Sequence, residues 1–313
     1  MVKVMQNSLQ VISATVLALP NRIRRLPLTV IACLLAVYVI WGSTYYAIRI
    51  ALGGLPPFLL VGSRYLVAGA ILLVILRARG AAWPTKRQWL NSAMVGALLL
   101  GGGNGGVTVA EQWVASSLAA AIIATAPLWA ALFSGLFGKW PARLEWVGIV
   151  IGLAGVVVLN LEGDLRASPL GAVVLVLAPV CWALGSVLSR RVNLPAGVMS
   201  AAAEMLAGGA LLFSISVLSG ERLTQLPTPA ALGAWVYLVV FGSLVAFSAY
   251  MYLIRTVRPA LALSYTYVNP IVALLLGVAL AGERISPLGL GTIAVMLAGV
   301  VFISLARGRA ASS

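Results

Sequence analysis

Uninterrupted apolar runs constrain the fold of this 313-residue chain more than any other feature. Ten runs approach or exceed the roughly 20 residues that an α-helix needs to cross about 30 Å of hydrocarbon. They cover 30–51, 56–78, 89–108, 112–137, 145–161, 168–189, 198–218, 231–252, 260–281 and 287–306. With 62% hydrophobic and only 9% charged residues, the chain is too apolar for a soluble domain. The sequence therefore predicts an all-α polytopic membrane protein.

The net charge of +14 is distributed in a way that indicates topology. Of the 21 Lys and Arg residues, 16 fall on one side of the predicted membrane. They are Lys3, Arg22, Arg24, Arg25, Arg77, Arg79, Lys86, Arg87, Lys139, Arg143, Arg190, Arg191, Arg255, Arg258, Arg307 and Arg309. Because basic loops resist translocation, we expect this side and both termini to be cytoplasmic. The basic excess then reports orientation, and no nucleic-acid partner is expected.

The second half of the chain repeats features of the first half. Pro127 and Pro270 are 270 − 127 = 143 residues apart, and Trp41 and Trp182 are 182 − 41 = 141 apart. Five predicted helices per copy is an odd number, so the second copy would enter the membrane upside down relative to the first. We expect a cytoplasmic or interfacial segment over 1–28, two inverted five-helix repeats over 29–165 and 166–306, and a tail over 307–313.

Several motifs resemble the EamA-type branch of the drug/metabolite transporter superfamily. They are Trp41-Gly42-Ser43-Thr44, the mid-helix prolines Pro127 and Pro270, and Gly282-Glu283-Arg284 before a Gly-rich last helix. The first repeat departs from the pattern, because Gly138-Lys139-Trp140 replaces the acidic turn. The resemblance implies a secondary transporter of the bacterial inner membrane that exports amino acids, aromatic ones among them, or other metabolites.

Aromatic side chains follow one face of the first predicted helix. Tyr38 and Tyr45 lie three and four residues from Trp41, so the three share a helical face. Trp182 occupies the matching place in the second copy, and Ser186 follows it at a spacing of four. Such a stripe either packs against other helices or lipid, or forms a cavity wall that stacks on substrate. We treat all five residues as candidates for substrate binding.

The segment around Pro270 is the most polar stretch of any predicted membrane helix. Pro270 removes a backbone donor and leaves the Thr266 carbonyl without its normal partner. Asn269 and Tyr267 lie beside it. The proline either kinks the helix for structural reasons or exposes groups that bind a substrate ammonium or hydroxyl, with Asn269 and Tyr267 as candidates.

A third candidate segment is the glycine-rich run around Asn104. Gly101, Gly103 and Gly106 match the spacing of a dinucleotide-binding loop. That match carries no weight, because the run ends a membrane helix and no strand precedes it. Small residues there favour close helix approach, and Asn104 is predicted to face the cavity.

Arg64 and Glu204 lie well away from the ends of their predicted helices, where charged groups are costly and commonly functional. Arg64 lies about seven residues from the outer start of 56–78, and Glu204 about six from the inner start of 198–218. Their depths differ by roughly 10 Å, so we expect no tight ion pair between them. Arg64 either attracts a substrate carboxylate or contacts polar backbone and water, and Glu204 is the candidate proton site.

The residues that are missing narrow the function further. The chain has no His, and its one aspartate, Asp164, lies in a predicted loop. Metal-dependent, acid-dyad and serine-nucleophile chemistry need His or paired carboxylates in the helices, so we expect no enzyme, metal or cofactor. The favoured function is a secondary transporter that resides in a lipid bilayer and exports small metabolites, foremost aromatic or apolar amino acids, by alternating access. The alternative is an antiporter of other small metabolites, such as phosphorylated sugars or drugs.

Overall fold

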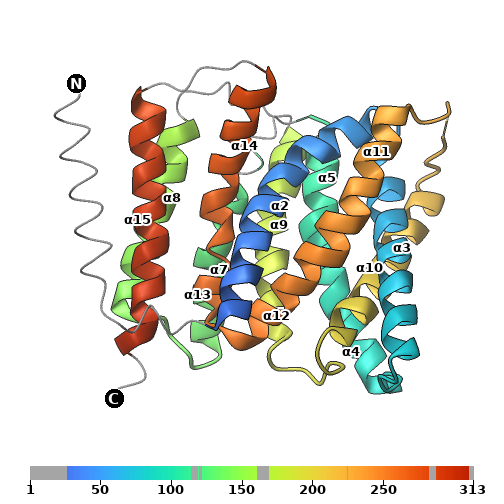
Figure 1. The fold of residues 1–313 in the computed structure, drawn as a ribbon, viewed down its shortest axis with the longest axis horizontal. Coiled ribbons are helices and arrows are strands. Elements are labelled where there is room, and N and C mark those ends of the chain that lie inside the picture. Colours follow the sequence, from blue (N-terminus) through green and yellow to red (C-terminus); the bar gives the residue numbers. More distant parts are fainter. Residues whose placement is uncertain are drawn as a thin grey trace.

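A computed structural model describes residues 27–113, 119, 122–160, 169–223, 225–281 and 287–309. All regular structure in these residues is helical, as the sequence predicted (Figure 1). The predicted leader, the Gly282-Glu283-Arg284 turn and the end of the tail lie outside the described residues.

The first half contains α2 (Leu28–Leu52), α3 (Pro57–Ala78), α4 (Lys86–Gly96), the π-helix η2 (Ala97–Gly105), α5 (Gly106–Ala110), α7 (Ala126–Leu136) and α8 (Arg143–Asn160). The second half contains α9 (Pro169–Leu188), α10 (Met199–Leu218), α11 (Pro229–Tyr237), the π-helix η3 (Leu238–Phe247), α12 (Ser248–Thr256), α13 (Pro259–Ala262), α14 (Tyr265–Ala281) and α15 (Pro287–Arg309). The segments α4-η2-α5 and α11-η3-α12 each form one continuous helix.

Five of the described helices are long and apolar enough to cross a membrane. They are Leu28–Leu52, Pro57–Ala78, Lys86–Ala110, Met199–Leu218 and Pro229–Thr256. Shorter apolar helices cover Ala126–Leu136, Val173–Leu188 and Ala294–Ile303. Helices thus occupy the predicted intervals, while the count of ten crossings stays a prediction.

Local sequence sets where the third helix of each half begins. Thr85 forms a capping box before α4: its Oγ1 accepts from the Gln88 backbone N–H at 3.3 Å, and Gln88 Oε1 accepts from the Thr85 N–H at 2.9 Å. Thr228 caps α11, with its Oγ1 accepting from the Ala231 N–H at 3.2 Å. These caps satisfy donors that the first helical turn leaves unpaired. Equivalent threonines therefore start the two long helices that contain η2 and η3.

Pro127 corrects the expectation of a proline-kinked fourth helix. The chain turns at Ala124 and Thr125, and α7 begins at Ala126. Pro127 therefore sits in the first turn of a new helix, where a missing N–H costs nothing. The helix is interrupted before the proline instead of bending at it.

Pro270 behaves as predicted, because it lies inside α14. The predicted helix over 260–281 is nevertheless divided. A turn at Leu263 and Ser264 separates α13 from α14. Both halves thus interrupt their fourth helix, and Ala124, Leu263 and Ser264 at the interruptions are buried.

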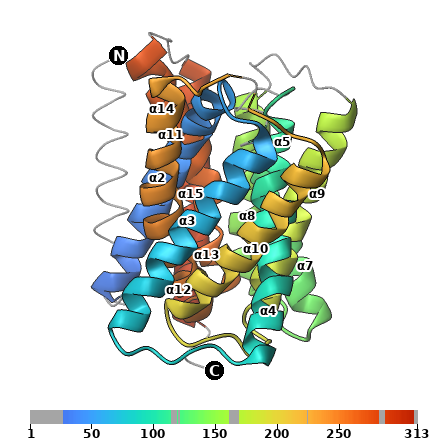
Figure 2. The ribbon, with the colours of Figure 1, turned by 90° about the vertical axis from the view of Figure 1, so that its right-hand side faces the viewer.

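Two tight helix pairs flank the centre of the molecule. Helix α3 packs along α10 at one side, and α8 packs along α15 at the other (Figures 1 and 2). Glycines permit the close approach. A Cβ at Gly62 would lie 2.6 Å from the backbone nitrogen of Phe213, and one at Gly299 would lie 2.7 Å from that of Gly152. Each pair joins one helix of the first half to one of the second.

The central helices exchange partners in the same reciprocal way. Helix α2 packs against α14 and against the helix that contains η3. Helix α9 packs against α7 and against the helix that contains η2. The first helix of each half therefore crosses the interrupted and π-helical elements in the interior.

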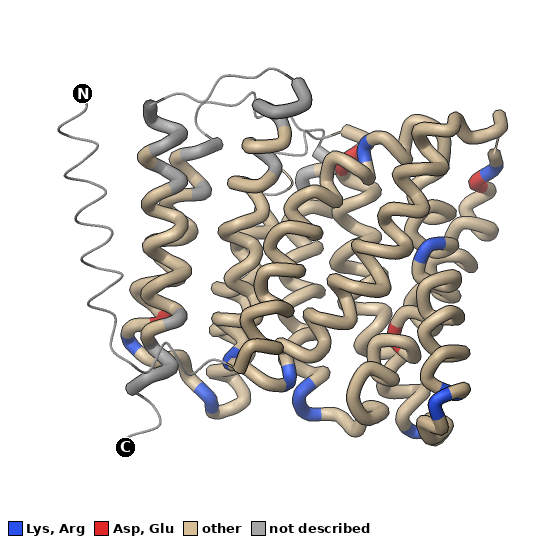
Figure 3. The backbone as a smooth tube through the Cα atoms, viewed as in Figure 1, with Lys and Arg blue, Asp and Glu red and all other residues tan. Residues whose placement is uncertain are grey.

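Charged side chains separate between the two ends of the bundle. Lys and Arg gather at the end where α3 finishes and α4 starts, drawn at the bottom of Figure 3. We call this the basic end. The described ion pair there joins Arg258 Nη1 to Glu145 Oε2 at 3.1 Å. Arg49, Glu111, Glu221 and Arg222 follow or precede helix ends at the opposite end. The separation agrees with the charge pattern of the sequence.

Candidate functional site

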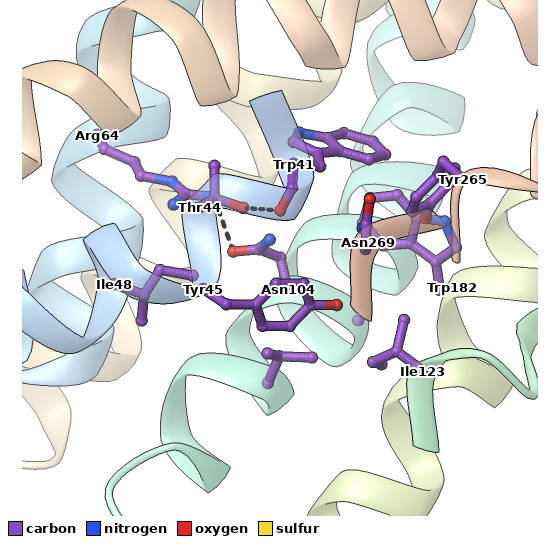
Figure 4. Close-up of a pocket in the computed structure, with 12 residues that line it drawn as sticks. Trp41, Thr44, Tyr45, Ile48, Arg64, Asn104, Ile123, Trp182, Tyr265 and Asn269 are labelled. Atoms are coloured by element: carbon purple, nitrogen blue, oxygen red, sulfur yellow. Dashed lines mark hydrogen bonds between the residues drawn. The ribbon is translucent and has the colours of Figure 1, made fainter. Parts of the chain in front are cut away.

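A small cavity of about 50 Å³ lies at the centre of the bundle. Its lining comes from α2, α3, η2, α5, α9, α14 and the residues before α7 (Figure 4). The lining residues are Trp41, Thr44, Tyr45, Ile48, Arg64, Gly103, Asn104, Val107, Ile123, Trp182, Tyr265 and Asn269. Such a volume holds a few water molecules, whereas pockets for small organic ligands enclose about 300–1,000 Å³. A small organic molecule would fit only if the walls moved apart, so we call this conformation closed.

Six of the nine candidate residues line this cavity: Trp41, Tyr45, Arg64, Asn104, Trp182 and Asn269. The sequence reasoning missed Thr44 and Ile48, although both lie on the helical face of Trp41, at spacings of three and seven. It also missed Tyr265, which lies four residues before Asn269 and so shares its face. Extending each face by one turn would have found all three.

Tyr38 and Ser186 lie outside the cavity, one turn nearer the basic end than the two tryptophans. The Tyr38 hydroxyl shares a hydrogen bond of 2.6 Å with the Ser264 hydroxyl, at the turn between α13 and α14. Ser186 Oγ donates to the Trp182 carbonyl at 2.6 Å. Both side chains hold elements that border the cavity.

Tyr267 also lies outside the cavity and faces α8. Its hydroxyl donates to the Ile149 carbonyl at 3.3 Å, and its ring covers Gly152, where a Cβ would lie 2.8 Å away. The physical reason is its phase on the helix. Residues two apart point to different sides, so Tyr267 cannot share the face of Tyr265 and Asn269.

Four buried rings form an aromatic cluster, made of Trp41, Trp182, Tyr250 and Tyr265. The Trp41 ring centroid lies 5.4 Å from that of Trp182, 5.2 Å from Tyr250 and 4.8 Å from Tyr265. Helix α2 runs away from the basic end, and Trp41 precedes the other cavity residues on it. The aromatic cluster therefore closes the cavity on the side of the basic end.

Each tryptophan of the cluster rests on the π-helix of the other half. Trp41 Nε1 donates to the Gly242 carbonyl in η3 at 3.0 Å. Trp182 packs on Gly103 in η2, where a Cβ would lie 2.6 Å from its ring. Trp182 Nε1 donates to the Tyr250 hydroxyl at 3.1 Å. π-Helical turns are rare in proteins overall, but those that occur are frequently found at functional sites. Here both π-helices support the same aromatic cluster.

Arg64 places an incompletely paired cation on the cavity wall. The side chain is only 2% exposed. Its Nη2 donates to Asn104 Oδ1 at 2.8 Å and to the Tyr65 hydroxyl at 2.6 Å. Nε and Nη1 are buried without a hydrogen-bond partner among the described residues. Because a buried unpaired charge is costly, this guanidinium is suited to receive an anionic group.

Asn269 offers an acceptor on another wall of the cavity. It is 1% exposed, and its Oδ1 has no partner in the described part of the chain. Figure 4 shows Asn269 beside Trp182 and Tyr265, across the cavity from Arg64. The cavity thus combines free donors, a free acceptor and aromatic faces.

Two buried acids complete the charged groups near the centre. No ion pair joins Arg64 to Glu204 among the residues that the structure describes, as expected from their depths. Glu111, which the sequence analysis left out, follows α5 and is only 9% exposed. Burial raises the pKa of its carboxyl well above the usual range, while the charges of Arg49 and Arg64 act in the opposite direction. Nothing in the residues around Glu111 signalled this burial.

A larger cavity of about 590 Å³ opens at the basic end. It lies between α7, α9, α13 and the loop before α8, and Pro127 lines it. Pro127 is four residues from Ile123, which lines the central cavity. The two cavities therefore follow the same segment, with the aromatic cluster on the basic side of the central one.

Comparison with known proteins agrees with this architecture. The sequence profile of the EamA-like transporter family matches residues 28–161 and again residues 169–305. The inner membrane transporter YedA of Escherichia coli is 48% identical over 287 residues, covering 91% of this chain and 94% of YedA. The protein PecM of Dickeya dadantii is 28% identical over 268 residues, covering 84% of this chain and 86% of PecM.

One solved crystal structure has the same fold, with a TM-score of 0.72, 23% identity, and coverage of 89% of this chain and 98% of its own. The family profile accounts for both halves of the chain, and YedA extends the match over nearly its whole length. The chain belongs to the EamA-like transporter family of the drug/metabolite transporter superfamily.

Proposed function

We propose that this protein is a transporter of the bacterial inner membrane that exports aromatic or apolar amino acids by alternating access. One observation carries the proposal: the free Nε and Nη1 of Arg64 and the free Oδ1 of Asn269 lie on different walls of one aromatic cavity. An amino acid carries its carboxylate and its ammonium group on the same carbon atom. The carboxylate fits the wall of Arg64, and the ammonium fits the wall of Asn269.

The charges of such a zwitterion match the cavity. A carboxylate would accept a charge-assisted hydrogen bond from the free Nε or Nη1 of Arg64, while Nη2 keeps its bonds to Asn104 and Tyr65. The ammonium would bind Asn269 Oδ1 and the faces of Trp41 or Tyr265, because cations are attracted to aromatic faces. The side chain would then lie against apolar residues such as Ile48.

Alternating access is supported by the arrangement of the two halves. The family profile matches twice, and α3–α10 and α8–α15 pair reciprocally. We propose ten membrane crossings in two inverted repeats, over 29–165 and 166–306, with both termini in the cytoplasm. The cavity of about 590 Å³ at the basic end would be the cytoplasmic entrance. Separation of the aromatic cluster would join it to the central cavity.

The cavity favours amino acids over the alternative substrates. Arg64 is the one ionisable cation in its lining. A phosphorylated sugar would require several cations to balance its charge. A cationic drug would meet Arg64 with no carboxylate to balance it in the lining.

Transport into proteoliposomes tests this proposal. We expect saturable uptake of labelled phenylalanine and leucine that unlabelled phenylalanine inhibits. Glucose 6-phosphate and a lipophilic cation serve as comparison substrates, and protein-free vesicles provide the background. Saturable uptake of either comparison substrate, with none of the amino acids, would refute amino acid export.

A further inference from the structure

Glu204 is a buried carboxyl without a hydrogen-bond partner among the described residues, on α10 toward the basic end. Its side chain is 0% exposed, and both oxygens lack a hydrogen bond in the described structure. An ionised carboxylate in such surroundings costs several kcal/mol, whereas the neutral acid costs far less. Two other described acids are paired: Glu145 with Arg258, and Glu221 with the backbone N–H groups at the start of α3. Glu204 therefore differs from them in kind.

The elements around Glu204 keep water away from it. Helix α10 packs against α3, α4, η2 and α12. The contact with α4 is close, because a Cβ at Gly96 would lie 2.6 Å from the Glu204 carbonyl oxygen. Ser92, one turn earlier on that face of α4, is also fully buried with an unpartnered hydroxyl. Neither Gly96 nor Ser92 carries a positive charge that could neutralise an ionised Glu204.

The charged and titratable groups on these packed elements are few. Arg64, Tyr65 and Arg77 lie on α3, Lys86 and Arg87 start α4, Tyr250, Tyr252 and Arg255 lie on α12, and η2 has none. The Arg255 charge acts on Glu204 without a direct ion pair in the described chain. Arg255 Nη1 instead donates to the Pro195 carbonyl at 3.0 Å, at the basic end. The Arg255 cation thus lies between the buried Glu204 carboxyl and the basic end.

Helix α12 also connects Glu204 to the central cavity. Tyr250 lies on α12, five residues before Arg255, and α12 packs against α10, the helix of Glu204. Its hydroxyl binds the Ser186 hydroxyl and accepts from Trp182 Nε1. Trp182 lines the cavity. Separation of the aromatic cluster would therefore also displace Tyr250 and with it α12, which packs against the helix of Glu204.

We propose that Glu204 binds a proton in the closed conformation and releases it when the bundle opens at the basic end, so that export is coupled to proton exchange. On opening, water reaches the carboxyl, its O–H bond breaks, the proton passes to water, and the carboxylate pairs with Arg255. In the reverse step the carboxylate leaves Arg255 and binds a proton that enters from the opposite end of the bundle, which restores the acid. The coupling rests on the proposed function, whereas protonation of Glu204 does not.

Infrared spectroscopy tests protonation without any substrate. A protonated carboxylic acid has a carbonyl stretching band that a carboxylate lacks. We expect purified protein at pH 7.5 to lose part of this band in Glu204→Gln and to keep it in the matched control Glu221→Gln. Comparison with Glu204→Gln removes the contribution of Glu111. Identical bands in the original protein and a folded Glu204→Gln variant would overturn the proposal.

A pH gradient tests coupling. If one proton moves against each substrate, a gradient of one pH unit supports about tenfold accumulation of phenylalanine in proteoliposomes. We expect Glu204→Gln to carry phenylalanine equally with and without the gradient, Glu204→Asp to retain the response, and Glu221→Gln to match the original protein. A gradient response in Glu204→Gln would overturn the coupling. Absence of amino acid transport in the original protein would instead refute the proposed function and leave the infrared result standing.

Discussion

The two ends of the central bundle carry a similar pair of charges with the signs exchanged. Toward the opposite end, the cation Arg64 is buried on α3 and acts on the acid Glu111 near the helix terminus. Toward the basic end, the acid Glu204 is buried on α10 and the cation Arg255 lies near the terminus of α12. Neither Arg64 with Glu111 nor Glu204 with Arg255 forms an ion pair among the described residues.

The two buried charges are suited to bind different ligands. The buried cation lines the cavity and offers free donors, which suits a substrate carboxylate. The buried carboxyl of Glu204 does not line the cavity, and no hydrogen-bond donor contacts it among the described residues. These surroundings suit the binding of a proton. Because α3 and α10 pack along each other, we expect movement at one charge to be transmitted to the other.

Removal of the buried cation should have the largest effect. Arg64→Gln loses the charged hydrogen bond to the carboxylate, about 1.5–3 kcal/mol, or roughly 10- to 100-fold in affinity. Equilibrium binding of labelled phenylalanine to purified protein measures this. Arg222→Gln, a change of the same kind in a loop at the opposite end, should bind normally. Undiminished binding by Arg64→Gln would remove the proposed contrast between the ends.

A methyl group added between α3 and α10 should weaken the packing of the two helices that carry Arg64 and Glu204. In Gly62→Ala the new Cβ would overlap the backbone of Phe213, so we expect about 1–3 kcal/mol of destabilisation. A lower midpoint of thermal unfolding in detergent measures it. Gly233→Ala is the control, since no atom lies within 4 Å of a Cβ there. Equal midpoints for both variants would mean that α3 and α10 are not tightly linked.

Asn269 tests the ammonium side of the cavity. Asn269→Ala removes the free acceptor, and we expect about tenfold weaker binding of phenylalanine. Binding of an analogue without the amino group, phenylpropionate, should be unaffected, which distinguishes loss of the acceptor from general damage. Asn91→Ala, whose side chain donates to the Asn193 carbonyl near the basic end, is the matched control. Equal losses for both ligands would contradict the assignment.

The two central tryptophans should respond alike and most weakly. Trp41→Phe and Trp182→Phe each remove one indole N–H bond, to Gly242 and to Tyr250, while keeping an aromatic ring. Each loss is about 0.5–1.5 kcal/mol, or up to roughly tenfold in transport rate. Initial uptake rates in proteoliposomes compare them. A large difference between the variants would show that the halves support the aromatic cluster unequally.

The helices were predictable because a helix that spans a membrane requires a long run of apolar residues, which can be read directly from the sequence. The interruption before Pro127 was not, since a proline that starts a helix and one that kinks it look the same in sequence. Tyr267 was assigned to the cavity although its phase on the helix of Asn269 argued against this. The burial of Glu111 depends on the packing of distant helices, which no local pattern encodes.

The two π-helices have a further consequence for which neighbours one helix can reach. In an α-helix each residue advances about 100° around the axis, so a long helix presents one stripe in a fixed direction. The wider turns of η2 change that phase. Helix α4, before it, packs against α10, while α5, beyond it, packs against α9. One long apolar helix thus packs against the helix of Glu204 with its first stretch and against a helix of the cavity wall with its last, whereas α11 and α12, on either side of η3, both pack against α2.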